Sequence, residues 1–248
     1  MKSILYIDHL VVKRSTEFSL KIDELRLPPG KVLCVTGQNG SGKSTFLESI
    51  SGVLKPNSGL VSIAGRPLSR NLRQAKANIG YIPDDEEWII RELCAREYFD
   101  LLAKIYDKIR TPVDIRQNTV RLANALQFTS FKQQLGQLSH GNKKKVQLIA
   151  GLMHEPKLII IDELRNGLDP LAIKAAEKLV ANEANRGAAV VVATHDLWWA
   201  ERNANEIIIL DQGCPQVQDT AGNLVKQHGS LEALFIKNME ATHGTAAL

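Results

Sequence analysis

The sequence predicts an α/β protein with a doubly wound core, and three observations lead to this class. Two unbroken apolar runs of strand length, LIIID at 158–162 and AAVVVAT at 188–194, are typical of parallel strands covered on both faces. A helical pattern from Pro170 to Arg186 joins these runs, as a parallel crossover requires. Extended patterns dominate the first part of the chain, and helical periodicity dominates its middle.

The elements of the first part are predicted to be short strands. They are the stretches ILYI, FSLKI, KVLCVTG and, after the turn KPNSG, LVSIAG. Apolar residues then recur at three- and four-residue steps from Leu93 to Ile109 and from about Val113 to Leu126, which predicts two helices. A further helix begins near LSHGN at 138–142, and a short one is expected within SLEALFIKNME at 230–240.

These patterns predict one domain over residues 1–248. Residues 1–83 and 156–220 are expected to form a β-rich core that carries the chemistry. Residues 84–155 are expected to form an inserted helical lobe, and residues 221–248 a C-terminal tail.

Composition excludes several classes of protein. The 31 basic and 27 acidic residues give a formal charge of +4, which is too mild to indicate nucleic acid as a partner. Cys34, Cys94 and Cys214 lie far apart without CxxC or Cys/His spacing, so neither a disulfide scaffold nor a zinc site is expected. Asp8 and His9 interrupt the apolar segment that a signal peptide needs, and no stretch has the length of a membrane span. We expect a cytoplasmic protein that another chain must hold if it works at a membrane.

The segment GQNGSGKST matches the phosphate-loop pattern GxxxxGK[ST] between a predicted strand and a predicted helix, which is the context that the motif requires. Its glycines let backbone N–H groups curl around phosphate oxygens, Lys43 neutralises the β- and γ-phosphates, and the Ser44 hydroxyl is a ligand for Mg²⁺. A chance glycine turn is the alternative, which the flanking strand and helix disfavour. The predicted nucleotide-binding residues are Gly37, Gln38, Asn39, Gly40, Ser41, Gly42, Lys43, Ser44 and Thr45.

Two carboxylates, Asp162 and Glu163, end the first buried run. The carboxyl ends of parallel strands face the crevice where ligands bind, so Asp162 is expected to hold the metal through water. Glu163 is expected to polarise the water that attacks the γ-phosphate. An acidic pair after a strand is by itself more often a solvated strand end, but the phosphate loop favours the functional role.

His195 follows the second buried run, in the sequence THD. A lone histidine is usually structural or merely exposed. At this sheet edge, a neutral imidazole would donate to the γ-phosphate or position the water and Glu163, so we count His195 with Glu163 as a catalytic candidate.

The stretch LSHGNKKK at 138–145 places three lysines at the start of a predicted helix. Cations oppose the helix dipole at that end, by a few tenths to about 1 kcal/mol each, unless an anion binds there. The lysines therefore indicate a nearby anion site, although two of the three are equally well explained as a solvated helix face.

Together these motifs resemble the nucleotide-binding subunit of ATP-binding cassette (ABC) transporters, over nearly the whole chain. The resemblance makes GQNGSGKST the Walker A loop, LIIIDE the Walker B strand and His195 the switch histidine. It implies a P-loop ATPase fold with a RecA-like, mostly parallel sheet, an antiparallel β subdomain and an inserted helical subdomain. ATP and Mg²⁺ are the implied cofactors, and ATP hydrolysis the implied reaction.

The resemblance also gives LSHGN a role. It is similar to the family signature LSGGQ, which binds the γ-phosphate of ATP held by the Walker A loop of another subunit. The resemblance thus assigns Ser139, Gly141 and Asn142 to an anion site formed in trans, and Asp169 to the D-loop within NGLD.

Several positions depart from the family pattern. His140 replaces the first signature glycine, and Asn142 replaces glutamine. Asp84 stands at the Q-loop glutamine position, where its oxygen can still reach Mg²⁺.

Two further departures concern the adenine and a turn. The aromatic residue that stacks on adenine has no clear counterpart near KRSTEF, where Arg14 and Phe18 are the alternatives. Leu164 and Arg165 replace proline and a small residue, which we expect to affect turn geometry more than chemistry.

The segments ELCAREYFDLLAKIY, LSHGNKKKVQL and SLEALF resemble the type-2 exporter branch, whose separate permeases move substrates outward. The implied partners are a second ATPase subunit, in a homodimer or a heterodimer, and an integral-membrane permease that holds the chain at the inner face of the cell membrane. Trp198 and Trp199 are expected either to pack against the sheet or to mark a contact surface.

Two alternatives from other classes remain. In the first, the chain is a soluble ABC-type ATPase that acts as an assembly or regulatory factor without a permease. In the second, it is a regulatory binding module without turnover. The presence of Glu163 and His195 disfavours the second alternative.

Overall fold

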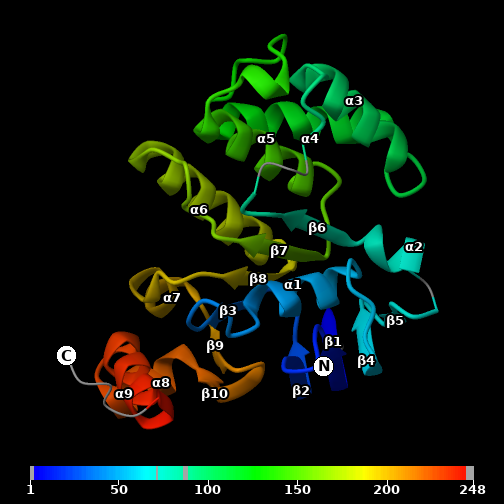
Figure 1. Cartoon of the computed structure of the whole chain (residues 1–248). Helices are drawn as coiled ribbons and strands as arrows, with labels where there is room; N and C mark the ends of the chain where they lie inside the picture. Colours follow the sequence, from blue (N-terminus) through cyan, green and yellow to red (C-terminus); the bar gives the residue numbers. More distant parts are fainter. Residues whose placement is uncertain (1–2, 71, 86–88, 244–248) are drawn as a thin grey trace.

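The computed structural model describes residues 3–70, 72–85 and 89–243. The last five residues of the expected tail, and three residues of the expected helical lobe, lie outside this description. The architecture confirms the predicted α/β class, with one mostly parallel sheet, one antiparallel sheet and helices against both (Figure 1).

The central sheet has six strands in the order β10-β9-β3-β8-β7-β6. Five of them run parallel, and β10 is antiparallel to β9 at one edge. The predicted neighbours β7 and β8 pair directly, and β8 separates β7 from β3. The bounds are β3 Val32–Thr36, β6 Ile79–Ile82, β7 Leu158–Asp162, β8 Ala189–Ala193, β9 Glu206–Asp211 and β10 Cys214–Thr220.

Both faces of this sheet are buried. Successive side chains of a strand point to opposite faces, and here each set lies in an apolar core. Leu33 and Val35 of β3 belong to one apolar core, whereas Cys34 between them belongs to the other. The unbroken apolar runs of the sequence are therefore explained by two-sided burial.

One face is covered by α1 (Lys43–Ser51) and by a four-stranded antiparallel sheet in the order β2-β1-β4-β5. The strands are β1 Leu5–Lys13, β2 Ser19–Leu27, β4 Ser58–Ile63 and β5 Arg66–Pro67. Leu10, Leu20 and Phe46 are buried between the two sheets.

The other face is covered by the longer helices of the middle and later parts of the chain. Helices α3 (Ala95–Ile105), α4 (Pro112–Ala125) and α5 (His140–Leu152) gather at one end of the molecule, whereas α6 (Pro170–Asn185) crosses between β7 and β8 (Figure 1). A five-residue helix α2 (Leu72–Lys76) and a 3₁₀ turn (Leu135–Gln137) connect these parts. Helix α3 ends four residues before Ile109, and Thr111 caps the start of α4.

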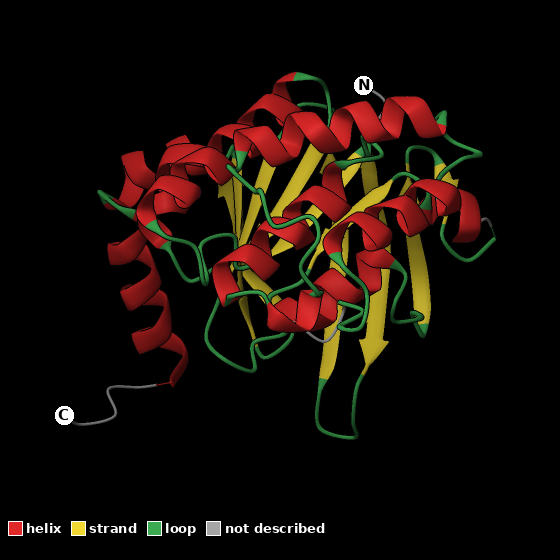
Figure 2. Ribbon diagram, turned by 90° about the horizontal axis from the view of Figure 1, so that it is seen from above, coloured by secondary structure: helices red, strands yellow, loops and turns green. Residues whose placement is uncertain are grey.

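The region after Gly213 is more ordered than the sequence indicated. It forms β10 and two helices, α8 (Ala221–His228) and α9 (Leu231–His243), where one short helix was expected. Leu224 and Leu231 are buried, so α8 and the start of α9 pack on the body, and Figure 2 shows α9 running along one side to the C-terminus. On α7 (Leu197–Asn203), Trp199 is buried as expected for packing, but Trp198 is 63% exposed and lies against Arg202.

Candidate functional site

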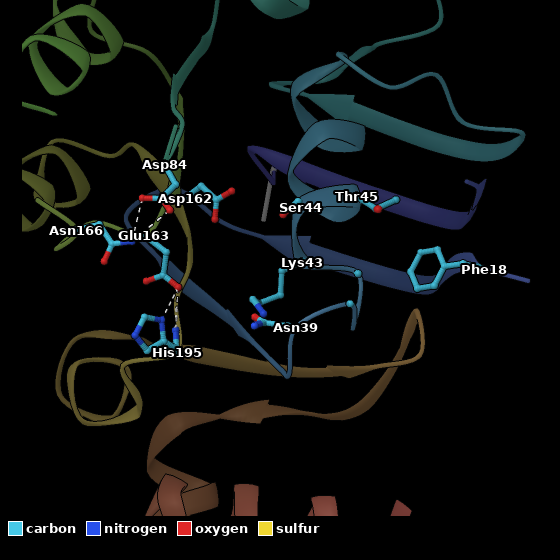
Figure 3. Close-up of a pocket in the computed structure, with 12 residues that line it drawn as sticks. Phe18, Asn39, Lys43, Ser44, Thr45, Asp84, Asp162, Glu163, Asn166 and His195 are labelled. Atoms are coloured by element: carbon cyan, nitrogen blue, oxygen red, sulfur yellow. Dashed lines mark hydrogen bonds and ion pairs between the residues drawn. The ribbon is translucent and has the colours of Figure 1, made fainter. Parts of the chain in front are cut away.

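Four parallel strands, β3, β6, β7 and β8, end at the same edge of the central sheet, and the predicted site residues follow them. This edge holds a cavity of about 520 Å³ between the glycine loop on one side and the carboxylates on the other (Figure 3). Its lining residues are Phe18, Asn39, Gly40, Gly42, Lys43, Ser44, Thr45, Asp84, Asp162, Glu163, Asn166 and His195. The sequence predicted most of this set, and the fold brings it together.

The glycine loop between β3 and α1 depends on two backbone positions. Gly37 has a φ of 154°, and a Cβ there would stand 2.3 Å from the carbonyl oxygen of Leu210. Gly42 has a φ of 111° and precedes α1 without a side-chain cap. The N–H groups of the first turn of α1 are thus left without a capping side chain beside the cavity, which is the arrangement that binds phosphate.

Lys43 is the first residue of α1, and its side chain contacts the start of this loop. Its ammonium donates to the carbonyl oxygens of Gly37 at 2.8 Å and of Gln38 at 3.0 Å. Burial lowers the pKa of Lys43, and the nearby Glu163 and Asp162 oppose that shift. Of the predicted loop residues, Gly37, Gln38 and Ser41 do not line the cavity; Ser41 is buried behind it.

Asp162 ends β7 and faces the loop across the cavity. Burial, together with the negative charges of Asp84 and Glu163, raises the pKa of Asp162 to about 6. Lys144 and Lys43 act in the opposite direction. The carboxylate edge thus has an excess of negative charge that a cation would stabilise.

Glu163 is held by three hydrogen bonds from the end of β8. The Thr194 hydroxyl donates to its Oε2 at 2.9 Å, and the backbone N–H of His195 donates to its Oε1 at 3.2 Å. His195 Nδ1 lies 2.7 Å from the same Oε1 (Figure 3). Glu163 also has a φ of 51°, uncommon for a residue with a side chain, and its N–H donates to the carbonyl of Ala193. The predicted catalytic pair is therefore in direct contact.

Asp84 also reaches the cavity. Asn166 Nδ2 lies 3.0 Å and 3.2 Å from its two carboxylate oxygens (Figure 3). Lys144 Nζ lies 3.9 Å from Asp84 Oδ1, although Lys144 belongs to α5. Sequence reasoning assigned Asp84 to the metal and gave Asn166 and Lys144 no role of their own.

Arg165 does more than shape a turn. It forms ion pairs with Asp196, the residue after His195, and at 3.9 Å with Glu177 of α6. Asp196 also caps α7 by accepting a hydrogen bond from the N–H of Trp199. Arg165 therefore ties the segment after Glu163 to the segment after His195, whereas Leu164 is simply buried.

The two adenine candidates have different surroundings. Phe18 lines the cavity on the far side of the loop from the carboxylates, where a Cβ on Gly42 would stand 3.0 Å from its ring (Figure 3). Arg14 forms an ion pair with Glu48 and does not line the cavity. Of the two alternatives, only Phe18 lies at the site.

The signature residues lie outside the cavity. Ser139 is exposed at the start of α5, where its Oγ accepts the N–H of Asn142 at 3.4 Å. A Cβ on Gly141 would stand 2.8 Å from the carbonyl oxygen of Gly167. Asp169 also stays outside, because it caps α6 through the N–H groups of Leu171 and Ala172.

In this site, a glycine loop follows one parallel strand, and its lysine faces an aspartate and a hydrogen-bonded glutamate at the end of another parallel strand. This is the geometry of a P-loop nucleoside triphosphatase. Comparison with known proteins narrows this class. Residues 20–166, more than half of the chain, match the family described as ABC transporter, and the chain belongs to that family. It is an ATP-binding subunit of an ABC transporter, and its activity is that of an ATPase.

Individual relatives agree with this assignment. The chain is 31% identical over 218 residues to the ABC-type transporter ATP-binding protein EcsA of Bacillus subtilis (strain 168), covering 86% of each chain. It is 27% identical over 223 residues to the Nod factor export ATP-binding protein I of Burkholderia pseudomallei (strain 1710b), covering 85% of this chain and 69% of that one.

A solved ATP-binding subunit of an ABC transporter is similar in structure, with a TM-score of 0.88 and 28% identity, over 96% of this chain and all of the other. Among the described residues of our chain, no helix combines the length and apolarity needed to cross a membrane.

Proposed function

We propose that this subunit hydrolyses ATP with Glu163 as the general base and His195 as its positioning partner. The observation that carries the proposal is the 2.7 Å contact between His195 Nδ1 and Glu163 Oε1, on the side of the cavity opposite Lys43. Three hydrogen bonds fix the Glu163 carboxylate, so it is preorganised to accept the proton of an attacking water.

Different residues around the cavity would bind different parts of the nucleotide. Lys43 and the N–H groups at the start of α1 would hold the phosphates, because both provide positive electrostatic potential at one point. Phe18 would stack on the adenine at the other end of the cavity.

The donor set at the carboxylate edge fits Mg²⁺. Asp162, Ser44 and Asp84 offer the hard oxygen ligands that this ion prefers, and the excess negative charge around Asp162 favours a cation. Among the described residues, no group of three His, Cys, Asp or Glu side chains is arranged to hold a metal alone. Mg²⁺ would therefore share its coordination with nucleotide oxygens and water, and would neutralise charge on the phosphates.

The signature residues favour a dimer. Ser139, Gly141 and Asn142 are outside the cavity of their own chain, and Ser139 is exposed. In a head-to-tail pair, the start of α5 in one subunit would approach the phosphates held by the other, and Asp169 would lie near the interface. Such a dimer contains two composite sites.

The subunit is proposed to drive an exporter through a separate integral-membrane permease, at the inner face of the cell membrane. This step is supported by relatives whose names describe Nod factor export and by the exporter-like sequence of α3, the signature and α9. ATP binding would close the dimer, hydrolysis would reopen it, and the permease would follow these movements.

Membrane fractionation in the source cell tests the transport proposal. A tagged chain should sediment with membranes and purify with one polytopic membrane protein, and deleting that protein should release the chain. ATP-dependent accumulation of the transported substrate should then be measured in inside-out vesicles, because an exporter in such vesicles moves its substrate into the lumen. A chain that stays in the soluble fraction under these conditions would instead support the soluble ATPase alternative.

A further inference from the structure

Lys144 is one of the most deeply buried large side chains of the described protein, at 1% exposure. It belongs to α5, five residues after Ser139. Its neighbours in the lysine run, Lys143 and Lys145, are half-buried. A buried ammonium is unfavourable unless hydrogen bonds and opposite charge replace its water, so its partners must account for it.

The partners of Lys144 come from two strand ends at the cavity. Its Nζ donates to the carbonyl oxygen of Pro83, directly after β6, at 2.9 Å. It also donates to the carbonyl oxygen of Asp162, at the end of β7, at 3.2 Å. The nearest carboxylate oxygen is Asp84 Oδ1 at 3.9 Å. The three N–H donors of one ammonium therefore face three groups on two segments that carry the predicted metal ligands.

Asp84 has a position that complements this lysine. Its side chain is 43% exposed toward the cavity, and Asn166 holds it from the segment after β7. Asp84 also lies close enough to Asp162 for its negative charge to raise the pKa of Asp162. Lys144 is the buried positive charge beside both of them.

We propose that Lys144 is a positioning residue for hydrolysis, which fixes the signature helix α5 to the segments carrying Asp84 and Asp162 and provides the countercharge that Asp84 requires. A displacement of the start of α5 then moves the carboxylate edge, because the Lys144 ammonium joins the two. The inference deepens the proposed function, since it rests on hydrolysis at the Glu163 site.

The test replaces Lys144 with methionine, which keeps the length of the side chain and removes its charge. Single-turnover hydrolysis with saturating ATP should fall about tenfold or more, the upper range of energetic coupling between neighbouring groups. The dissociation constant for ATP, measured by calorimetry, should stay within about threefold, since Lys144 does not line the cavity. A lower single-turnover rate with a nearly unchanged dissociation constant separates positioning from nucleotide binding.

Rescue is the second measurement. Adding Asp84→Asn to Lys144→Met removes the negative charge left without its countercharge but keeps one side-chain oxygen for Mg²⁺, and should raise the rate at least about threefold above that of Lys144→Met. Lys144→Arg, which keeps the charge, should lose less than Lys144→Met. Lys104→Met, the same substitution at an exposed position of α3, is the matched control and should behave as wild type.

An unchanged rate in Lys144→Met would overturn the inference. The same holds if Lys144→Met, Lys144→Arg and the double variant with Asp84→Asn all lose the same fraction of the wild-type rate. If Lys144→Met does not fold, Lys144→Gln is measured instead, because its amide can still donate to a carbonyl but carries no charge. Wild type and Glu163→Gln are run in parallel. Wild-type turnover in Glu163→Gln would refute the proposed catalytic base, whereas wild-type turnover in Lys144→Met alone would refute only the role of Lys144.

Discussion

The phosphate loop and the signature segment begin with the same kinds of residue, yet they form different structures. In both, glycine, serine and lysine residues cluster around the start of a helix. At the phosphate loop, Gly42 leaves the first turn of α1 without a side-chain cap, and Lys43 lines the cavity. At the signature, Ser139 caps the first turn of α5 with its own hydroxyl, and Lys144 is directed into the protein interior.

The difference lies in what surrounds each helix start. The phosphate loop follows a central strand, and the ends of β6 and β7 place carboxylates opposite it. The signature directly follows a 3₁₀ turn, away from the cavity of its own chain. A helix start becomes a complete binding site only where neighbouring strands provide the other groups, and we therefore propose that the start of α5 is half of a site.

The largest effect is expected at the carboxylate side of the complete site. Glu163→Gln removes the proposed base, and a positioned base contributes roughly 10²- to 10⁴-fold in rate, or about 3–5 kcal/mol of barrier. The variant should still bind ATP, because the phosphate loop is intact, and should accumulate as a closed dimer. Single-turnover hydrolysis and size-exclusion chromatography with ATP measure both results. Hydrolysis at the wild-type rate would move the role to another residue, with His195 the next one to replace.

The next largest effect is expected at the loop itself. Lys43→Ala removes a charge-assisted contact to the phosphates, worth about 1.5–3 kcal/mol, so ATP affinity should fall roughly 10- to 150-fold. Calorimetry measures it, with Lys104→Met as the exposed control. An unchanged affinity would contradict the assignment of this loop to phosphate binding.

A smaller effect is expected at the adenine end of the cavity. Phe18→Ala should weaken ATP binding about fivefold or more, because stacking of a base on an aromatic ring is worth about 1–3 kcal/mol. Arg14→Ala is the matched control, since Arg14 pairs with Glu48 and does not line the cavity. A larger loss in Arg14→Ala than in Phe18→Ala would reverse the assignment.

The smallest expected change is about twofold in the hydrolysis rate. It comes from an experiment that tests whether the start of α5 contributes to the site of the partner subunit. A tethered dimer of one Lys43→Ala subunit and one Ser139→Arg subunit would place both lesions in one composite site and leave the other intact. It should keep about half of the hydrolysis of the tethered wild-type pair, since one of the two sites survives. If phosphate contacts lay within one chain, each subunit would carry its own damage.

Strict cooperativity between the two sites would also abolish hydrolysis in the mixed dimer. Nucleotide occupancy separates the two cases. One ATP bound per mixed dimer supports the composite site, whereas none supports contacts within a single chain.

Local sequence was sufficient for the parts of the site that lie next to their own strand. The loop from Gly37 to Thr45, the pair Asp162–Glu163 and His195 were all placed at one sheet edge by strand and turn patterns, and the structure brings them there. This succeeded because a strand fixes the direction of the residues that directly follow it, and parallel strands end together. The roles of these residues, and the division of the chain into 1–83, 84–155, 156–220 and 221–248, remain predictions.

Contacts between distant segments were decided only by the tertiary structure. Lys144 and Pro83 are 61 residues apart, and nothing in the local sequence distinguished Lys144 from its neighbours Lys143 and Lys145. The choice between Arg14 and Phe18 depended on Glu48 of α1, which pairs with Arg14. The ion pair of Arg165 depends on Asp196, 31 residues later in the chain. The helices of the tail are held in place by the burial of Leu224 and Leu231.

The physical reason is common to these cases. Periodicity and turn residues describe which face of an element is apolar and where the element ends, and these properties belong to a few consecutive residues. A long charged side chain finds its partner by packing, which depends on elements far apart in the sequence. The sequence by itself thus determined the elements and the edge at which the chemistry gathers, whereas the folded chain decided which charge faces which.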